Sequence, residues 1–282
     1  MNPMRLPLRS ILAAASLAGA PLAQNTLFLE GFDSGIPPTW TQELLGVGAD
    51  VWLAGTNATT KSADVYHEYF CTNGTLLRDN RLVTPVIDLR GLRDAALRWD
   101  DFQVLPTWRN LNAVEVSVAK GPFTVIHTVT GATGGLRPVA VDVSMAAGRA
   151  DVRFGFRYRG DIANEWRIDN VRVTTSQPVH SIRGLVAGST ASFDIVGLVS
   201  GSAVVLGLSL SGEGPIPTFF GDVLLSPPLF LLPTIVAGAS GAVSLAVPIP
   251  NDIARVPVWT HGIEFQPSLT VRLTNAVVTT IR

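Results

Sequence analysis

The sequence predicts an all-β protein built from antiparallel β-sandwiches, and three observations support this fold class. Hydrophobic residues make up 47% of the chain and charged residues 15%, which is too apolar for a disordered chain. The 26 Gly and 19 Pro interrupt the sequence too often for long helices. Many short runs alternate apolar and polar residues with a period of two, which is typical of strands with one buried and one solvent-exposed face.

The N-terminal residues have the pattern of a secretory signal peptide. Arg5 and Arg9 precede an apolar run that ends in small residues and has about half the length of a membrane-spanning helix. We therefore expect a signal peptide at residues 1–23, with cleavage after either Ala20 or Ala23. The mature protein is expected to be secreted, either extracellular or at the cell surface.

The charge balance and the single cysteine limit the partners and the means of stabilisation. Loss of Arg5 and Arg9 leaves 19 of the 21 basic residues against 22 acidic ones, which argues against nucleic acid as a partner. Cys71 is the one cysteine, so no internal disulfide can form. A secreted protein without disulfides needs another source of stability, such as a metal ion or a large core. We interpret Cys71 itself as a small buried hydrophobic residue.

The first strand-rich region extends from residue 26 to about 174. Residues 114–118, 139–143 and 152–158 alternate clearly, and in 152–158 the large apolar side chains are expected to face inward while the arginines face outward. Residues 42–81 are less regular. We interpret them as long loops with one or two short strands, and long loops on a sandwich commonly carry binding sites.

A change in composition near residues 175–190 predicts a second region. Aromatic and charged residues become fewer there, and Gly, Ser, Leu and Val increase. The expected strands of this region are residues 191–196, 203–210, 241–247, 256–261 and 269–273. The apolar run 223–236 contains three prolines, so we interpret it as a buried β segment and expect no transmembrane segment.

Catalytic motifs are absent from the sequence. We find no Gly-x-Ser-x-Gly, His-Glu-x-x-His, Walker or Cys-x-x-Cys pattern, and the four histidines have no metal-ligand spacing. We therefore expect a protein that is not an enzyme. A glycan-acting hydrolase or lyase stays as an alternative, because the acidic residues permit many carboxylate pairs.

Three short motifs occur in order in the first region: "EGFDSGIPPTW" at residues 30–40, "RLVTPVIDLRG" at 81–91, and "FRYRG…WRIDNVRV" at 156–173. With these motifs the chain resembles the MAM-like, choice-of-anchor J and cleaved-adhesin type of bacterial jelly-roll domain over residues 28–173. The resemblance implies an antiparallel jelly-roll β-sandwich at 25–176.

The C-terminal part also resembles a known kind of domain. The segments "ASFDIVGL" and "SGAVSLAVPIPND" are similar to a C-terminal β-domain of secreted proteins from planctomycete-like bacteria. We therefore expect a second, smaller β-sandwich domain at residues 182–282. No activity and no residue roles follow from this resemblance.

The first resemblance also implies a structural calcium ion. In such jelly rolls the first and last strands lie side by side, and many members hold Ca²⁺ near that contact. This implies Glu30, Asp33 and Asp169 as calcium ligands, and Ca²⁺ takes six to eight oxygen ligands from carboxylates and carbonyls. The alternative is that Asp33 and Asp169 only accept hydrogen bonds from backbone amides of turns.

Aromatic residues in the loop-like segments are the candidate ligand contacts. Trp52, Tyr66, Tyr69 and Trp108 could stack on sugar rings if they are exposed. The leading hypothesis is an adhesin-like binding module that recognises carbohydrate or an extracellular protein. If these aromatics are buried, a structural component of the cell envelope becomes the better hypothesis. The sequence does not indicate the oligomeric state.

Overall fold

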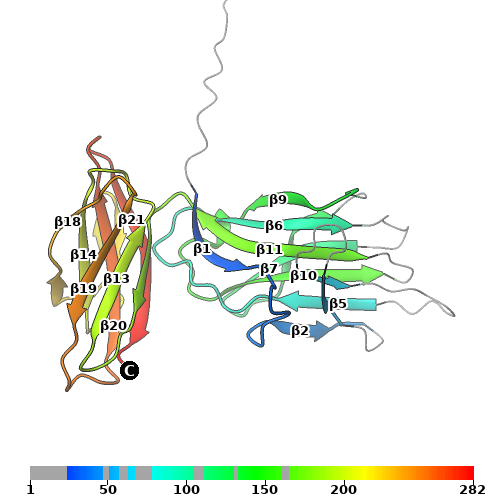
Figure 1. Cartoon of the computed structure of the whole chain (residues 1–282), viewed down its shortest axis with the longest axis horizontal. Coiled ribbons are helices and arrows are strands. Elements are labelled where there is room, and N and C mark those ends of the chain that lie inside the picture. Colours follow the sequence, from blue (N-terminus) through cyan, green and yellow to red (C-terminus); the bar gives the residue numbers. More distant parts are fainter. Residues whose placement is uncertain are drawn as a thin grey trace, which may run out of the picture.

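The computed structural model describes residues 24–46, 51–56, 63–67, 78–103, 111–129, 133–160 and 165–282. The predicted signal peptide and Cys71 lie outside these residues. The described part forms two lobes of antiparallel strands, and the strands of the second lobe run across those of the first (Figure 1). The predicted all-β class, with a smaller β-sandwich after the first, is confirmed.

Helical structure is minimal in the described part of the chain. It consists of one 3-10 turn, Ser144–Ala146, between two strands of the first lobe. Among the described residues no helix is long and apolar enough to cross a membrane. The many Gly and Pro residues explain this, because both interrupt helices.

The first lobe is a sandwich of two antiparallel sheets. The 6-stranded sheet has the order β3-β4-β11-β6-β9, with β1 also paired to β11. Its strands are β1 (Asn25–Glu30), β3 (Leu53–Thr56), β4 (Ala63–His67), β6 (Ala96–Gln103), β9 (Arg137–Asp142) and β11 (Trp166–Thr175). The 5-stranded sheet has the order β2-β5-β10-β7-β8. Its strands are β2 (Thr41–Leu44), β5 (Arg78–Val83), β7 (Leu111–Val118), β8 (Thr124–Val129) and β10 (Val152–Gly160).

Aromatic side chains from both sheets meet in the core of this sandwich. Alternation along β6 turns Leu97 and Trp99 inward, and both are fully buried. The ring centroids of Trp99 and Phe156, which belong to opposite sheets, lie 5.7 Å apart, and those of Phe156 and Trp166 lie 6.2 Å apart. The first of these contacts is edge-to-face, which adds to the free energy gained by burying the rings. The core therefore fixes how the two sheets face each other.

Ion pairs cover the outer face of the 5-stranded sheet. Arg81 Nε lies 2.6 Å from Glu115 Oε2, and Arg157 Nη2 lies 2.6 Å from Asp79 Oδ2. Gly155 makes room for this network, because a Cβ at that position would lie 2.6 Å from Cδ of Arg81. Arg157 thus faces outward and pairs with acidic side chains, and the outward direction is the one that the alternation predicted.

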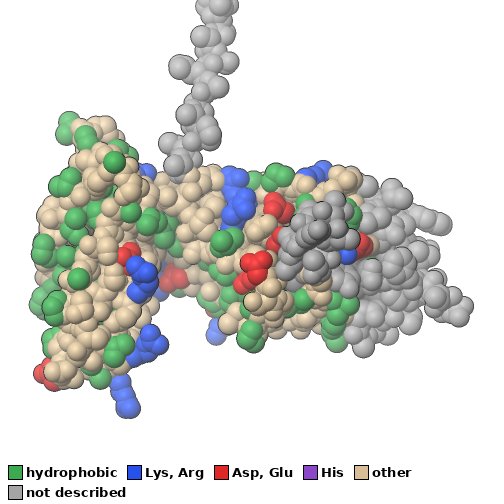
Figure 2. Space-filling model, in the orientation of Figure 1, with side chains coloured by type: hydrophobic (Ala, Val, Ile, Leu, Met, Phe, Trp, Pro, Cys, Tyr) green, Lys and Arg blue, Asp and Glu red, His purple; other side chains and the backbone are tan. Residues whose placement is uncertain are grey.

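The second lobe contains a 3-stranded sheet, a 5-stranded sheet and a short hairpin. The 3-stranded sheet is β12 (Val179–Arg183), β13 (Thr190–Val196) and β19 (Ala242–Pro248). The 5-stranded sheet contains β14 (Ala203–Ser209), β17 (Leu229–Leu231), β18 (Ile235–Val236), β20 (Pro257–Phe265) and β21 (Val271–Thr280). The hairpin is β15 (Ile216–Thr218) with β16 (Gly221–Val223). Charged side chains are sparse on the face of this lobe shown in Figure 2, and several of them lie beside the junction with the first lobe.

Direct hydrogen bonds join the two lobes. The backbone N–H of Ala276 donates to the carbonyl oxygen of Arg90 at 2.9 Å. The side-chain amide of Gln177 donates to the carbonyls of Leu273 at 2.9 Å and Gly91 at 3.2 Å. The turn that follows Ile87 in the first lobe therefore rests on β21 of the second.

Candidate functional site

The first and last strands of the first lobe lie side by side, as the resemblance implied. β1 pairs with β11 in antiparallel register, with Glu30 opposite Val171. We call this pairing, with the turn at residues 31–35 that follows β1, the seam. Asp169 is 2% exposed and lies two residues before Val171, beyond the end of this register, opposite Asp100 of β6.

Two side-chain oxygens face one space at the seam. Gly31 has no side chain, and a Cβ built there would lie 3.5 Å from Oδ2 of Asp33 and 3.6 Å from Oδ1 of Asn170. The glycine therefore leaves a small cradle that these two oxygens border. An amide oxygen and a carboxylate oxygen are both ligands that Ca²⁺ accepts.

Asn170 is a seam residue that sequence reasoning missed. Its φ is +49°, a conformation in which asparagine is enriched. Its backbone N–H donates to Asp169 Oδ1 at 2.6 Å, and its side-chain Nδ2 donates to Asp100 Oδ2 at 2.9 Å and to Asp169 Oδ2 at 3.2 Å. The amide nitrogen thus holds two carboxylates, which orients Oδ1 toward Gly31. The Asp-Asn pair within the last motif was the available signal.

The predicted ligand set is only partly assembled around this cradle. Glu30 Oε1 accepts a hydrogen bond of 2.8 Å from the backbone N–H of Phe32, so it also serves the turn. Within the described ranges, no three His, Cys, Asp or Glu side chains are grouped as metal ligands. The two oxygens that the structure brings to the cradle are Oδ2 of Asp33, whose side chain is exposed, and Oδ1 of Asn170.

Of the aromatic residues predicted to contact a ligand, Trp52 is buried in the core. Trp52 is 1% exposed, and its ring lies 5.2 Å from Trp166 in the core. The side chain of Gln42 accepts a hydrogen bond from the backbone N–H of Trp52 at 2.8 Å and donates one to the Trp52 carbonyl oxygen at 3.1 Å. These two bonds hold Trp52 against the sandwich. The ring of Trp52 is therefore part of the core, and the structure does not present it as an exposed ligand contact. The backbone of Tyr66 pairs in β4 with Leu53.

The remaining aromatic candidates were expected to lie on loops. The side chain of Tyr66 lies outside the described residues, as do Tyr69 and Trp108 entirely. Their role as ligand contacts stays a prediction.

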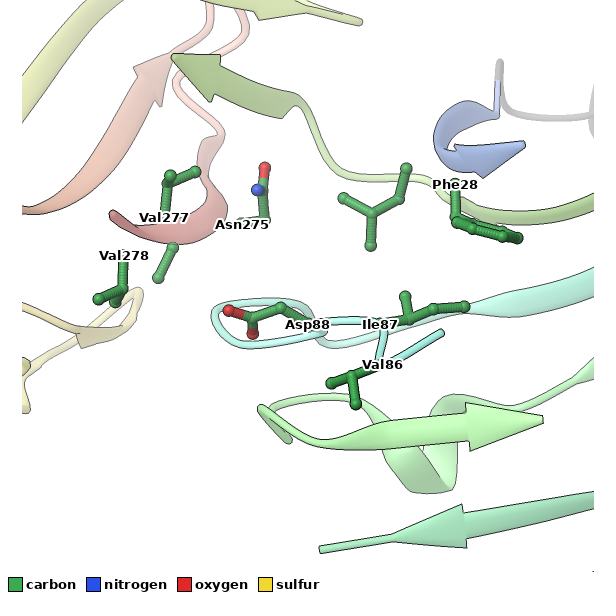
Figure 3. Close-up of a pocket in the computed structure, with 9 residues that line it drawn as sticks. Phe28, Val86, Ile87, Asp88, Asn275, Val277 and Val278 are labelled. Atoms are coloured by element: carbon green, nitrogen blue, oxygen red, sulfur yellow. The ribbon is translucent and has the colours of Figure 1, made fainter. Parts of the chain in front are cut away.

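A pocket of about 310 Å³ lies at the junction of the lobes (Figure 3). Its lining residues are Leu27, Phe28, Val86, Ile87, Asp88, Asn275, Ala276, Val277 and Val278. The lining is largely apolar, and its carboxylate is already paired, because Asp88 Oδ2 lies 2.5 Å from Arg90 Nη2. Arg90 Nη1 in turn lies 2.7 Å from Glu213. The polar groups beside this pocket thus serve the contact between the lobes.

Two histidines, His180 and His261, are buried in the second lobe. His180 Nδ1 lies 3.1 Å from the carbonyl oxygen of Asp194, so it donates there, and Nε2 lies 2.9 Å from the Thr260 hydroxyl. Burial lowers the pKa of His180 to about 4, although the hydrogen bond to Asp194 acts in the opposite direction. Burial also lowers the pKa of His261. Both rings are parts of the packed structure and not exposed bases.

No protein-family model and no curated protein sequence matches the chain. Among solved structures, the K1 cleaved adhesin domain of Lys-gingipain from Porphyromonas gingivalis W83 is similar, with 24% identity, a TM-score of 0.41, and coverage of 54% of this chain and 97% of that one. The K3 cleaved adhesin domain of the same protein gives 16% identity, a TM-score of 0.44, and coverage of 54% and 100%. The enzymatically active domain of bacteriophage CBA120 tailspike protein 4 gives 12%, 0.39, and coverage of 51% and 20%. Likenesses at this level carry no conclusion about function.

Proposed function

We propose that the chain is a non-catalytic binding module, secreted or at the cell surface, that recognises carbohydrate or an extracellular protein. The supporting observation is how its charged side chains are used in the described part of the chain. Buried carboxylates such as Glu115 and Glu264 are bonded to Arg81 and Arg272, each at 2.6 Å. A glycan hydrolase needs two carboxylates facing a cleft, one with a raised pKa. Carboxylates held in structural ion pairs favour binding over hydrolysis.

A structural calcium ion at the seam is part of this proposal. Glu30, Asp33 and Asp169 would supply carboxylate oxygens, and Asn170 would supply its amide oxygen. A cation there would offset the repulsion among these acids and Asp100, and would tie the first strand of the lobe to the last. This would provide the stability that disulfides give other secreted proteins.

The calcium proposal is tested by thermal unfolding in EDTA and then in excess CaCl₂. Calcium at about a hundredfold excess over its Kd should stabilise the protein by about 2.7 kcal/mol, because it binds only the folded state. Asp33→Ala should unfold as the wild type does in EDTA, since this side chain is exposed, yet lose the calcium shift. Asp252→Ala, an exposed acid of the second lobe, is the matched control and should keep the shift. A wild type insensitive to calcium would contradict the proposal.

The binding proposal is tested on a glycan array and on a set of extracellular matrix proteins. We expect retention of the secreted protein on at least one class, with no release of shortened glycan products. Product release would instead support the hydrolase or lyase alternative. Retention on neither class would favour a structural role in the cell envelope.

A further inference from the structure

The last strand of the second lobe is at the edge of its sheet. β21 stands at the end of the order β17-β14-β20-β21, and in the described part of the chain β20 is the strand that pairs with it. It lies on the side of the second lobe that faces the first (Figure 1). Edge strands usually hide their unpaired N–H and C=O groups with charges, prolines or a covering segment. What covers β21 therefore decides what can bind there.

Contacts at both ends of β21 show which of its backbone groups point away from β20. The N–H of Ala276 donates to a carbonyl of the first lobe, so it points outward. The N–H and C=O of Ile281 bond to residues 255–256, which lead into β20, so they point inward. These directions alternate along a strand. Both ends agree that the backbone groups of Val278 and Thr280 point outward.

These two outward residues have no backbone partner. The N–H and C=O groups of Val278 and Thr280 bond to no neighbouring segment among the described residues. We call these groups the open edge. The same edge of β21 is covered on either side of it, by the Arg90 carbonyl at 2.9 Å and by residues 185–187, which bond to Arg282 at 3.0 and 2.8 Å. The open edge is therefore recessed between two covering segments.

Two pockets give access to the open edge. One, of about 560 Å³, is lined by residues 182–185 on one side and by Thr279, Thr280 and Arg282 on the other. The second is the junction pocket of about 310 Å³, which Val278 also lines (Figure 3). The side chains of Val278 and Thr280 are themselves exposed. A ligand can therefore approach the open edge from solvent.

The shape of the open edge favours an extended peptide as the ligand. Two outward residues present alternating donors and acceptors, and an extended backbone carries matching groups at the same spacing. The stretch from Ala276 to Arg282 is about 20 Å long at about 3.3 Å per residue, which admits only a short paired segment. The covering segments keep out the sheet edge of a folded protein. They also keep out β21 of a second copy, because its open edge is recessed in the same way.

The two pockets define the side chains of that peptide. The lining of the larger one contains Arg183 and Arg282 and no acidic side chain. Nε of Arg183 donates to Asp194 at 2.8 Å, yet the side chain is 75% exposed and its terminal nitrogens face solvent. The junction pocket is largely apolar, and its Val86 is 55% exposed. A peptide with a carboxylate beside the arginines and an apolar residue beside Val278 is complementary to both.

We propose that the second lobe binds an extended, acidic segment of a partner protein by strand addition at the open edge. The segment pairs with the backbone of Val278 and Thr280, and its carboxylate lies at Arg183. This inference rests on the proposed binding function, and it names a site and a partner chemistry for the recognition of protein. It places that site on the second lobe, away from the seam.

Amide hydrogen exchange of the secreted protein, followed by NMR, tests the proposal. In the free protein the amides of Val278 and Thr280 should exchange much faster than that of Thr279, which points toward β20. The probe is a capped pentapeptide with the sequence threonine, valine, glutamate, valine, threonine. At about tenfold excess over its Kd it should slow exchange at Val278 and Thr280 by about tenfold, because only the free fraction exchanges. Exchange at Thr279 should not change.

Variants of the peptide and of the protein are the matched controls. The same peptide with methylated backbone nitrogens has lost its donors and should have no effect. A peptide with lysine in place of glutamate should bind several-fold more weakly. Thr280→Pro removes one N–H of the open edge, at a position where an edge strand tolerates proline, and should weaken binding by about tenfold or more. Thr280→Val keeps that N–H and should bind the peptide as the wild type does.

Several results would overturn the inference. These are amides of Val278 and Thr280 that already exchange as slowly as Thr279, no slowing by the glutamate peptide, or equal slowing by the methylated or lysine peptide. A folded Thr280→Pro protein that binds as tightly as the wild type would also overturn it, and the methylated peptide gives a test that does not depend on that variant folding. Retention on a matrix protein or a glycan without a peptide response would overturn this site alone. Absence of all three would overturn the proposed binding function as well.

Discussion

Replacing Gly91 with alanine is expected to destabilise the protein by several kcal/mol and to loosen the contact between its lobes. Gly91 has a φ of +78°, which glycine adopts without strain and alanine does not. A Cβ there would lie 2.8 Å from the backbone nitrogen of Ala276 and 2.9 Å from the carbonyl oxygen of Thr274. Strain and overpacking each cost about 1–3 kcal/mol, so the sum is about 2–6 kcal/mol.

The obstruction at Gly91 lies in backbone and therefore cannot be relieved by a rotamer change. The same Cβ would lie 2.9 Å from Nε2 of His261, which is bonded to the Thr274 carbonyl. The neighbouring bond from Ala276 to the Arg90 carbonyl, at 2.9 Å, fixes the turn against β21. An added methyl group must therefore separate the two lobes or distort β21.

Gly134→Ala separates strain from overpacking. Gly134 also has a positive φ, of +66°, but nothing lies within 4 Å of the Cβ position. Calorimetry should show a single unfolding transition for the wild type and for Gly134→Ala, and separate or broadened transitions for Gly91→Ala. Equal losses of stability in the two variants would mean that the contact at Gly91 contributes nothing beyond backbone strain.

The alternation of side chains predicted the strands of the first lobe well. The pattern at residues 152–158 reports burial on one face of an antiparallel strand, and β10 buries Phe154 and Phe156 as expected. Such a pattern is local and depends only on the sequence of one strand. It could not predict that Gly155, between those two phenylalanines, makes room for Arg81 of a neighbouring strand.

Long-range contacts explain what the sequence could not predict. Trp52 lies in a segment that reads as a loop, yet its contact with Trp166 buries it. Gln177 gave no signal in the sequence, because its role depends on Leu273 and Gly91 meeting beside it. The resemblance predicted the seam through its motifs, but the oxygen of Asn170 is identified only by the direction of its side chain.

Acidification from pH 6.5 toward pH 4 is expected to destabilise the second lobe through its buried histidines. Burial lowers the pKa of His180 from 6.5 to about 4, so between these values the unfolded chain binds a proton that the folded chain does not. Stability must then fall as pH falls through this window, by up to about 1.4 kcal/mol per pH unit, and on the order of 3 kcal/mol in total. His261, whose pKa is also lowered by burial, adds to the loss in the same direction.

Urea denaturation between pH 7 and pH 5 measures this slope in a range where most carboxylates stay ionised. His180→Gln should be less stable than the wild type at pH 7, because the bonds to Asp194 and Thr260 are disturbed. Its stability should nevertheless depend less on pH, since the titrating ring is gone. His127→Gln is the comparison, as that ring is partly exposed, lies in the first lobe and has a pKa lowered by desolvation. A wild-type slope that survives in His180→Gln would show that proton uptake by other groups unfolds the protein in acid.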